Sequence, residues 1–105
     1  MPRVAAISRW KPEQTPAVLQ RFAEFLKGND SAVTEAFKRL NFIAWDFPSA
    51  YGQTTSVYVA EGNMKDISAF NRYWMDLLEY EILPCVDFET IIKFYPDKAI
   101  TALNP

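Results

Sequence analysis

The sequence predicts an α+β fold in which a four-stranded sheet carries helices on one face. β-Branched and apolar runs alternate with amphipathic segments of helical period, in the order strand, helix, strand, strand, helix, strand. The chain has 105 residues, so residues 1–105 are expected to form a single domain. Pro48 and Pro84 fall at the second and fourth strands, which this order places at the sheet edges, where proline is tolerated.

The first half of the chain is expected to form one strand and two helices. Residues 4–10 are apolar on both faces near their centre, as in a buried strand. Thr15-Pro16 begins a helix, because Thr caps free amides and Pro suits the first turn, and Gly28 ends it in a left-handed cap. Its apolar stripe consists of Val18, Leu19, Phe22, Phe25 and Leu26. Asp30-Ser31 caps a second, shorter helix that precedes the next strand.

The second half is expected to form three strands and two further helices. Strands over residues 41–47 and 54–60 are separated by a loop at residues 48–52. Asn63 caps a helix over residues 64–78. Its apolar stripe is Met64, Ile67, Phe70, Trp74, Leu77 and Leu78. A last strand over residues 80–85 and a short C-terminal helix over residues 88–94 complete the chain.

This βαββαβ order is that of a ferredoxin-like sandwich, here with an extra short helix before the second strand. Right-handed crossovers place the helices on one face of the sheet, with the first and third strands central. The strands nevertheless offer apolar side chains in both directions, as at Phe42 and Ile43. The uncovered face would expose an unusually large apolar patch. We therefore expect two copies to stack sheet on sheet as a homodimer, a dimeric α/β barrel.

Composition excludes several kinds of chemistry. The chain has no histidine, which removes His-ligated zinc, Ser-His and Cys-His nucleophiles, and a haem held by histidine. One cysteine, Cys85, cannot form an internal disulfide. The net charge of −2 argues against nucleic acid as a partner. No metal, cofactor or catalytic residue is assigned. No apolar run approaches the ~20 residues of a membrane span, and no signal peptide is visible, so a cytoplasmic setting is expected.

Aromatic residues are the candidates for a binding site. A pocket between helices and sheet would hold an apolar or aromatic small molecule, and its candidate lining is Trp10, Phe42, Trp45, Tyr58, Phe70 and Trp74. The structural alternative is that the tryptophans are core or dimer-interface residues whose indole N–H groups find acceptors.

Other polar residues have simpler interpretations. Arg9 is expected to form an exposed salt bridge to Glu13 or Glu81 rather than to anchor an anion. Cys85 is expected to be a small buried hydrophobic residue rather than a reactive thiolate.

Residues 74–87 carry a resemblance to a known family. They read WMDLLEYEILPCVD, similar to the W-x-D-L-L-x-F-E-(apolar)-x-P-V string of the domain-of-unknown-function 3303 family of small bacterial and archaeal proteins, with Tyr80 at the aromatic and Cys85 at the valine. Residues 9–13 and 18–25 also resemble the opening of that family, whereas residues 31–53 depart from it. The resemblance implies a ferredoxin-like, dimeric fold, and no reaction, because none is established for the family.

Three functions remain open from sequence. The first is a homodimeric binding or accessory protein without chemistry of its own. The second is an enzyme resembling the cofactor-independent monooxygenases of the dimeric α/β barrel superfamily, acting on a quinol or polyphenol, with Tyr58, Asp46 or an Asn transferring protons. The third, an RNA-recognition module, is disfavoured because the strand at residues 53–59 lacks the basic, Phe-rich motif of such modules.

Overall fold

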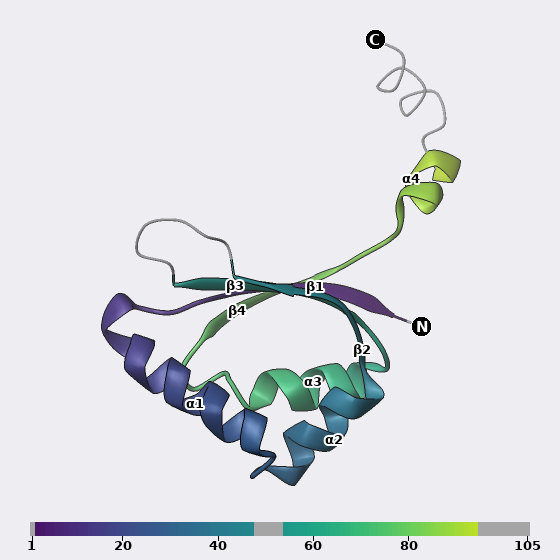
Figure 1. Ribbon diagram of the computed structural model, residues 1–105. Coiled ribbons are helices and arrows are strands. Elements are labelled where there is room, and N and C mark those ends of the chain that lie inside the picture. Colours follow the sequence, from purple (N-terminus) through teal and green to yellow (C-terminus); the bar gives the residue numbers. More distant parts are fainter. Residues whose placement is uncertain (1, 48–53, 95–105) are drawn as a thin grey trace.

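One four-stranded antiparallel sheet organises the molecule, with its helices on one face (Figure 1). The structure, a computed structural model, describes residues 2–47 and 54–94. The strands are β1 (Arg3–Arg9), β2 (Asn41–Asp46), β3 (Thr55–Glu61) and β4 (Glu79–Pro84). The helices are η1 (Pro12–Gln14, a 3-10 turn), α1 (Thr15–Lys27), α2 (Ser31–Arg39), α3 (Met64–Arg72) and α4 (Phe88–Phe94).

The strand order is β2-β3-β1-β4, so β1 and β3 are central as predicted. Each neighbouring pair is antiparallel, and the arrangement fits a ferredoxin-like fold. Pro84 closes the edge strand β4, which confirms its predicted position. Pro48 and the expected loop at residues 48–52 lie outside the described residues. A membrane-spanning helix would need a longer and more apolar stretch than any helix within residues 2–47 and 54–94 provides.

Local capping chemistry sets several helix ends as predicted. The Asp30 side chain accepts a hydrogen bond from the Val33 amide at 3.1 Å, and Asn63 accepts one from the Asp66 amide at 2.8 Å. Gly28 ends α1 with a left-handed φ of 71°. The cap expected at Thr15 is wrong. The 3-10 turn η1 runs directly into α1, and the Thr15 hydroxyl accepts from the Trp10 indole instead.

The helix expected over residues 64–78 ends earlier, at Arg72. From there the Trp74 amide donates to the Asn71 carbonyl and the Leu77 amide to the Trp74 carbonyl, which is the tighter spacing of consecutive turns. Trp74 and Leu78 remain buried through these turns. Apolar spacing alone predicted a continuous helix, because a series of turns keeps much the same side chains facing the core.

A bulge in β2 decides which aromatic residues face the helices. Phe42 pairs with Ala60 and Trp45 with Tyr58, while the register shifts between Phe42 and Ala44. Residues three apart in a regular strand face opposite sides of the sheet. The extra residue, Ile43, therefore turns both Phe42 and Trp45 towards the helices.

Candidate functional site

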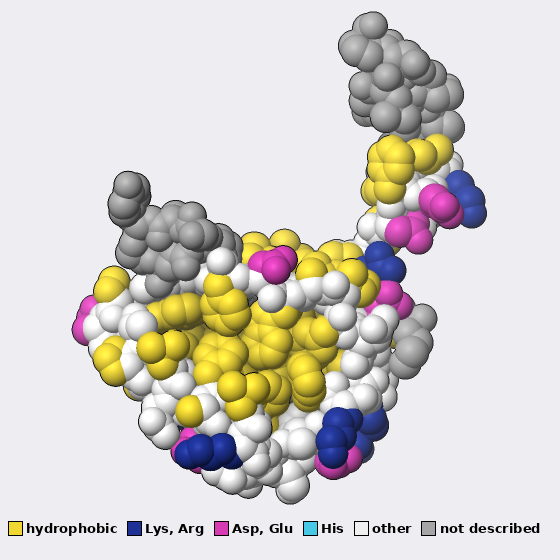
Figure 2. Space-filling model, viewed as in Figure 1, with side chains coloured by type: hydrophobic (Ala, Val, Ile, Leu, Met, Phe, Trp, Pro, Cys, Tyr) yellow, Lys and Arg dark blue, Asp and Glu magenta, His cyan; other side chains and the backbone are white. Residues whose placement is uncertain are grey.

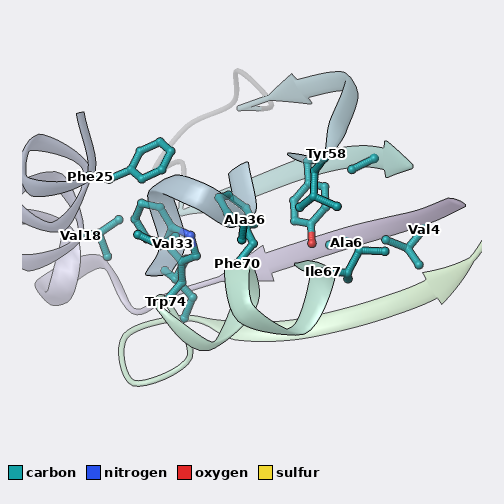
Figure 3. Close-up of a cluster of buried hydrophobic side chains, with 13 residues drawn as sticks. Val4, Ala6, Val18, Phe25, Val33, Ala36, Tyr58, Ile67, Phe70 and Trp74 are labelled. Atoms are coloured by element: carbon teal, nitrogen blue, oxygen red, sulfur yellow. The ribbon is translucent and has the colours of Figure 1, made fainter. Parts of the chain in front are cut away.

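Aromatic rings from both layers meet between the sheet and the helices. The ring of Phe70, on α3, has its centroid 5.0 Å from that of Phe42 and 5.6 Å from those of Trp45 and Tyr58. Figure 3 shows Tyr58 from the sheet, Phe25 from α1, and Phe70 and Trp74 from the α3 region reaching into this layer. We define the aromatic cluster as Phe22, Phe25, Phe37, Phe42, Trp45, Tyr58, Phe70 and Trp74.

The aromatic cluster contains every residue of the predicted site except Trp10. The Trp10 indole lies at the beginning of α1 and donates to the Thr15 hydroxyl at 3.0 Å. Sequence reasoning did not assign Phe22, Phe25 and Phe37 to the site. Their signal was the apolar stripe of the two helices, which predicted burial but not their partners.

The aromatic cluster has a closed base and an open side. Tyr58, Phe70 and Trp74 are at most 1% exposed, whereas Phe22, Phe42 and Trp45 are only partly buried. In the space-filling view, hydrophobic side chains gather in a hollow between the sheet and the helices (Figure 2). The cluster is therefore a core at its base and an accessible apolar surface at its mouth.

An apolar cleft adjoins this mouth. Its volume is about 370 Å³, within the range of small-molecule sites. We define it by its lining residues, which are Trp10, Thr15, Val18, Leu19, Phe22, Phe47 and Thr55. Phe22 joins it to the aromatic cluster, with its ring 4.7 Å from Trp74 and 5.5 Å from Trp45. Trp10 also lines a second cleft of about 510 Å³, whose other lining residues include Arg9, Lys11 and Glu79.

Polar side chains lie beneath the aromatic cluster, on the face of the sheet that meets the helices. The Tyr58 hydroxyl donates to the Asn71 amide oxygen at 2.6 Å. On the same face the Ser8 and Ser56 hydroxyls are 2.6 Å apart, and both residues are buried. Burial raises the pKa of Tyr58 to about 12, against the opposing effect of its bond to Asn71. Burial likewise raises the pKa of Tyr80, so both phenols stay protonated near neutral pH.

Three buried side-chain donors have no hydrogen-bond partner among the described residues: the Thr34 hydroxyl on α2, the Asn71 amide nitrogen and the Trp74 indole nitrogen, of which the last two lie at the base of the aromatic cluster. Asn71 is 2% exposed and Trp74 is 1% exposed. A flip of the Asn71 side-chain amide, which exchanges its nitrogen and oxygen, would leave the oxygen unpaired instead. One polar atom of Asn71 therefore stays unsatisfied in either orientation. An unpaired buried polar group costs about 1–3 kcal/mol. Such groups are rare in a folded chain unless a partner completes them.

A charged clamp holds α1 against the turns that follow α3. The Arg21 guanidinium donates to both carboxylate oxygens of Asp76, at 2.8 and 2.7 Å. It also donates to the Tyr73 carbonyl and lies over the Tyr73 ring, 5.2 Å from the centroid. The hydrogen bonds from Arg21 hold the pKa of Asp76 below its usual value. The clamp fixes the helix that carries Phe22 relative to Trp74.

The remaining predicted residues lie away from the aromatic cluster. Arg9 pairs with Glu81 at 3.9 Å, and both are exposed, which confirms the predicted salt bridge. Asp46 is in register with Val57, on the sheet face opposite the helices. Cys85 is only partly buried, so the prediction that it is a buried residue is wrong. It follows the last residue of an edge strand, where the sheet covers it on one side only.

Comparison with known proteins leaves the family open. No family model matches the chain, and no curated protein matches it. The resemblance of residues 74–87 to the domain-of-unknown-function 3303 family therefore stays a prediction.

Solved structures show distant likenesses. Protein Atu4242 from Agrobacterium tumefaciens is 16% identical, with a TM-score of 0.47 over 84% of this chain and 96% of that one. The NE2512 protein of unknown function from Nitrosomonas europaea is 20% identical, with a TM-score of 0.46 over 83% and 92%. An uncharacterised NIPSNAP-like domain protein from Burkholderia xenovorans is 11% identical, with a TM-score of 0.43 over 83% and 87%. The fold assignment above depends on the strand order, not on these likenesses.

Proposed function

We propose that the protein is a homodimeric binding protein for an apolar or aromatic small molecule, without chemistry of its own, in a cytoplasmic setting. One observation carries the binding proposal. An accessible apolar cleft adjoins an aromatic cluster whose base holds two buried, unpartnered polar groups on Asn71 and Trp74. Small-molecule sites typically combine an apolar lining with a few such polar groups.

The polar groups favour a ligand that carries an oxygen acceptor. The Trp74 indole nitrogen can only donate a hydrogen bond, and the Asn71 amide nitrogen also donates. Both donors are buried behind the lining of the apolar cleft, so a ligand must displace Phe22 or a neighbouring ring to reach one. A ketone or ether oxygen on an aromatic ring would then satisfy the donor without bringing a charge into an apolar site. A carboxylate would have to be desolvated, and no cation lies among the residues that line the apolar cleft.

Calorimetric titration with acetonaphthone and its oxygen-free analogue ethylnaphthalene tests this proposal. We expect both to bind and the ketone to bind more tightly. Trp74→Phe removes the indole N–H and should reduce the preference for the ketone. Equal affinities for the two probes in the natural protein would contradict the role of the donors.

A matched pair of variants on α1 locates the binding. Leu19→Arg introduces a charge at the mouth of the apolar cleft, where Leu19 is 63% exposed. Leu26→Arg makes the same change on the same helix at a residue that is 79% exposed and lies outside the lining. We expect the first variant to weaken binding by about tenfold or more, equivalent to ~1.4 kcal/mol, and the second to leave it unchanged. The same loss in both would place the ligand elsewhere.

The sheet face opposite the helices supports the homodimer. Alternation along the strands puts an apolar set on this face: Ala5, Ile7, Ala44, Val57, Val59 and Leu83. Four charged residues on this face pair within the chain, Arg3 with Glu61 at 2.7 Å and Arg9 with Glu81 at 3.9 Å. Asp46 and Glu79, on the two edge strands, have no ion pair among the described residues and are exposed. Two copies can therefore stack on the apolar centre if these two carboxylates stay at the solvent-exposed rim.

Sedimentation equilibrium of Val59→Lys tests the dimer. Val59 lies between Ala5 and Ala44 in the register, at the centre of the apolar face. A lysine there would place like charges together in a stacked pair, so we expect a monomer. Ala17→Lys, at an exposed position on α1, should leave the dimer intact. A natural protein that sediments as a monomer at micromolar concentration would overturn the dimer.

A cofactor-independent monooxygenase acting on quinols or polyphenols is the second candidate. The buried Tyr58–Asn71 pair at the base of the aromatic cluster favours it, because it offers a hydroxyl and an amide beside an apolar site. Asp46 cannot take part, since it lies on the other face of the sheet. The raised pKa of Tyr58 makes it a donor rather than a base.

Oxygen uptake with a panel of quinols and polyphenols tests the enzyme. Activity that Tyr58→Phe abolishes while binding is retained would support this second function. No uptake across the panel, from protein that binds acetonaphthone, would leave only the binding function.

A further inference from the structure

Helix α4 stands apart from the rest of the described chain. In Figure 1 it lies beyond the end of β4, on the side of the sheet opposite α1, α2 and α3. Hydrophobic side chains show on its surface (Figure 2), and Val86 and Phe88 are 61% and 60% exposed. An apolar segment in this position is unusual unless something covers it.

The sequence specifies α4 as an amphipathic helix. The Asp87 carboxylate accepts hydrogen bonds from the Thr90 amide and hydroxyl, both at 2.7 Å, which fixes the first turn. Phe88 and Ile91 are three residues apart and share a face. A helix of 7 residues is too short to persist alone in water, so packing of its apolar face must stabilise it.

The chain's own apolar cleft is out of reach of that face. Pro84, at the end of β4, pairs with Val4 at the beginning of β1, whereas Trp10 follows the other end of β1. The six residue-to-residue steps from Val4 to Trp10 span about 20 Å of extended chain. The connection from Pro84 to Phe88 extends by about 14 Å at most. It also leaves on the side of the sheet away from the helices, where the apolar cleft is not located.

A second copy brings the two surfaces together. Suppose that two sheets stack face to face about a two-fold axis perpendicular to the strands. The Pro84 end of β4 in one copy then lies over the Trp10 end of β1 in the other copy. Helix α4 projects towards the side where that second copy would sit (Figure 1). It would then lie beside the second copy's helix layer, at the end that carries the apolar cleft.

We propose that α4 of each copy docks its Phe88–Ile91 face over the apolar cleft of a second copy of this chain, so that each ligand site is closed by the other subunit. The proposal rests on the homodimer and the binding site proposed above. Leu19 is 63% exposed at the rim of the apolar cleft, and Phe88 is 60% exposed on α4. In the docked arrangement Phe88 of one copy covers Leu19 of the other, which accounts for the exposure of both.

Disulfide trapping between two differently labelled chains tests the docking. In a Cys85→Ser background, Leu19→Cys and Ile91→Cys are made separately, mixed, allowed to exchange subunits and oxidised. We expect a cross-linked species of twice the chain mass from the mixture. Leu26→Cys, on the same helix but outside the cleft, replaces Leu19→Cys in the control mixture and should give at least tenfold less cross-linking.

The outcomes separate this proposal from the homodimer itself. A dimer by sedimentation that cross-links no better through Leu19→Cys than through Leu26→Cys overturns the docking and leaves the dimer standing. A chain that sediments as a monomer overturns both. An intrachain disulfide in the doubly substituted Leu19→Cys/Ile91→Cys chain would show that α4 folds onto its own cleft, which also overturns the docking.

A second measurement does not depend on cross-linking. Phe88→Ser with Ile91→Ser changes side chains that are 60% and 39% exposed, so the rest of the chain should fold normally. We expect the dissociation constant of the dimer to rise at least tenfold, and the affinity for acetonaphthone to fall. An unchanged dissociation constant together with unchanged affinity would overturn the docking.

Discussion

Tyr58 and Asn71 are joined by a buried hydrogen bond of 2.6 Å that ties the centre of the sheet to α3. Tyr58 is 1% exposed and Asn71 is 2% exposed. The bond places a polar contact directly beneath the rings of Phe42 and Phe70, whose centroids lie 5.1 and 5.6 Å from that of Tyr58. Because its partners come from different layers, the bond also fixes how α3 is seated on the sheet.

Tyr58→Phe should destabilise the fold by about 1–3 kcal/mol, because it leaves the Asn71 amide oxygen buried without its donor. Phenylalanine fills nearly the same volume, so little of the loss should come from a cavity. Urea unfolding measures the change. The double variant Tyr58→Phe/Asn71→Leu removes both polar partners and should lose less than the sum of the single variants. A Tyr58→Phe protein as stable as the natural one would contradict this role of the bond.

The stability of the protein should decrease in alkaline solution. Burial raises the pKa of Tyr58 from its ordinary value of 10.0 to about 12, so the folded state keeps a proton that the unfolded chain releases. The stabilising contribution is complete below about pH 10 and is lost as the pH rises towards about 12. Urea midpoints measured at increasing pH should therefore fall across this interval.

The control for this pH dependence must include Tyr80, because burial raises the pKa of that phenol as well. We expect Tyr58→Phe to make the alkaline decrease shallower and Tyr58→Phe/Tyr80→Phe to make it shallower still. The same slope in all three proteins would mean that other groups cause it.

Arg21→Lys should loosen the attachment of α1 to the turns after α3. Lysine keeps the charge but cannot donate to both Asp76 oxygens and to the Tyr73 carbonyl in one planar arrangement. Asp76 is 63% exposed in its side chain, so solvent screens the ion pair, and the expected loss is only about 1 kcal/mol. Thermal unfolding measures it, with Arg72→Lys at an exposed position of α3 as the control. Equal losses in the two variants would contradict the clamp.

Three helix ends could be predicted because each depends on a few neighbouring residues, whereas the cap at Thr15 and the end of α3 were predicted wrongly. Asp30 and Asn63 cap amides three positions away, and Gly28 adopts its left-handed conformation without help from the rest of the fold. The strand order also followed from the order of elements and the position of Pro84. All of these signals lie within the local sequence or in general rules of topology.

The composition of the site could be predicted only in part, because it depends on contacts between distant residues. The bulge at Ile43 turns Trp45 towards the helices, and the sequence carries no strong mark of it. Phe22 meets Trp74 through the placement of α1, which the Arg21–Asp76 clamp helps to hold. Trp10 looked equivalent to the other tryptophans, but its bond to Thr15 keeps it at the edge of the apolar cleft.

Gly28→Ala should destabilise the protein by about 1–2 kcal/mol, because Gly28 ends α1 at a φ of 71°, where an L side chain crowds its own backbone. An added Cβ would lie 4.0 Å from the Thr34 hydroxyl, an ordinary contact, so the loss should come from the backbone conformation and not from a clash. Gly28→Asn separates the two causes, because asparagine has a larger side chain but tolerates this conformation better. Urea unfolding should therefore rank the natural protein above Gly28→Asn and Gly28→Asn above Gly28→Ala. A larger loss for Gly28→Asn than for Gly28→Ala would point to crowding between α1 and α2 as the cause.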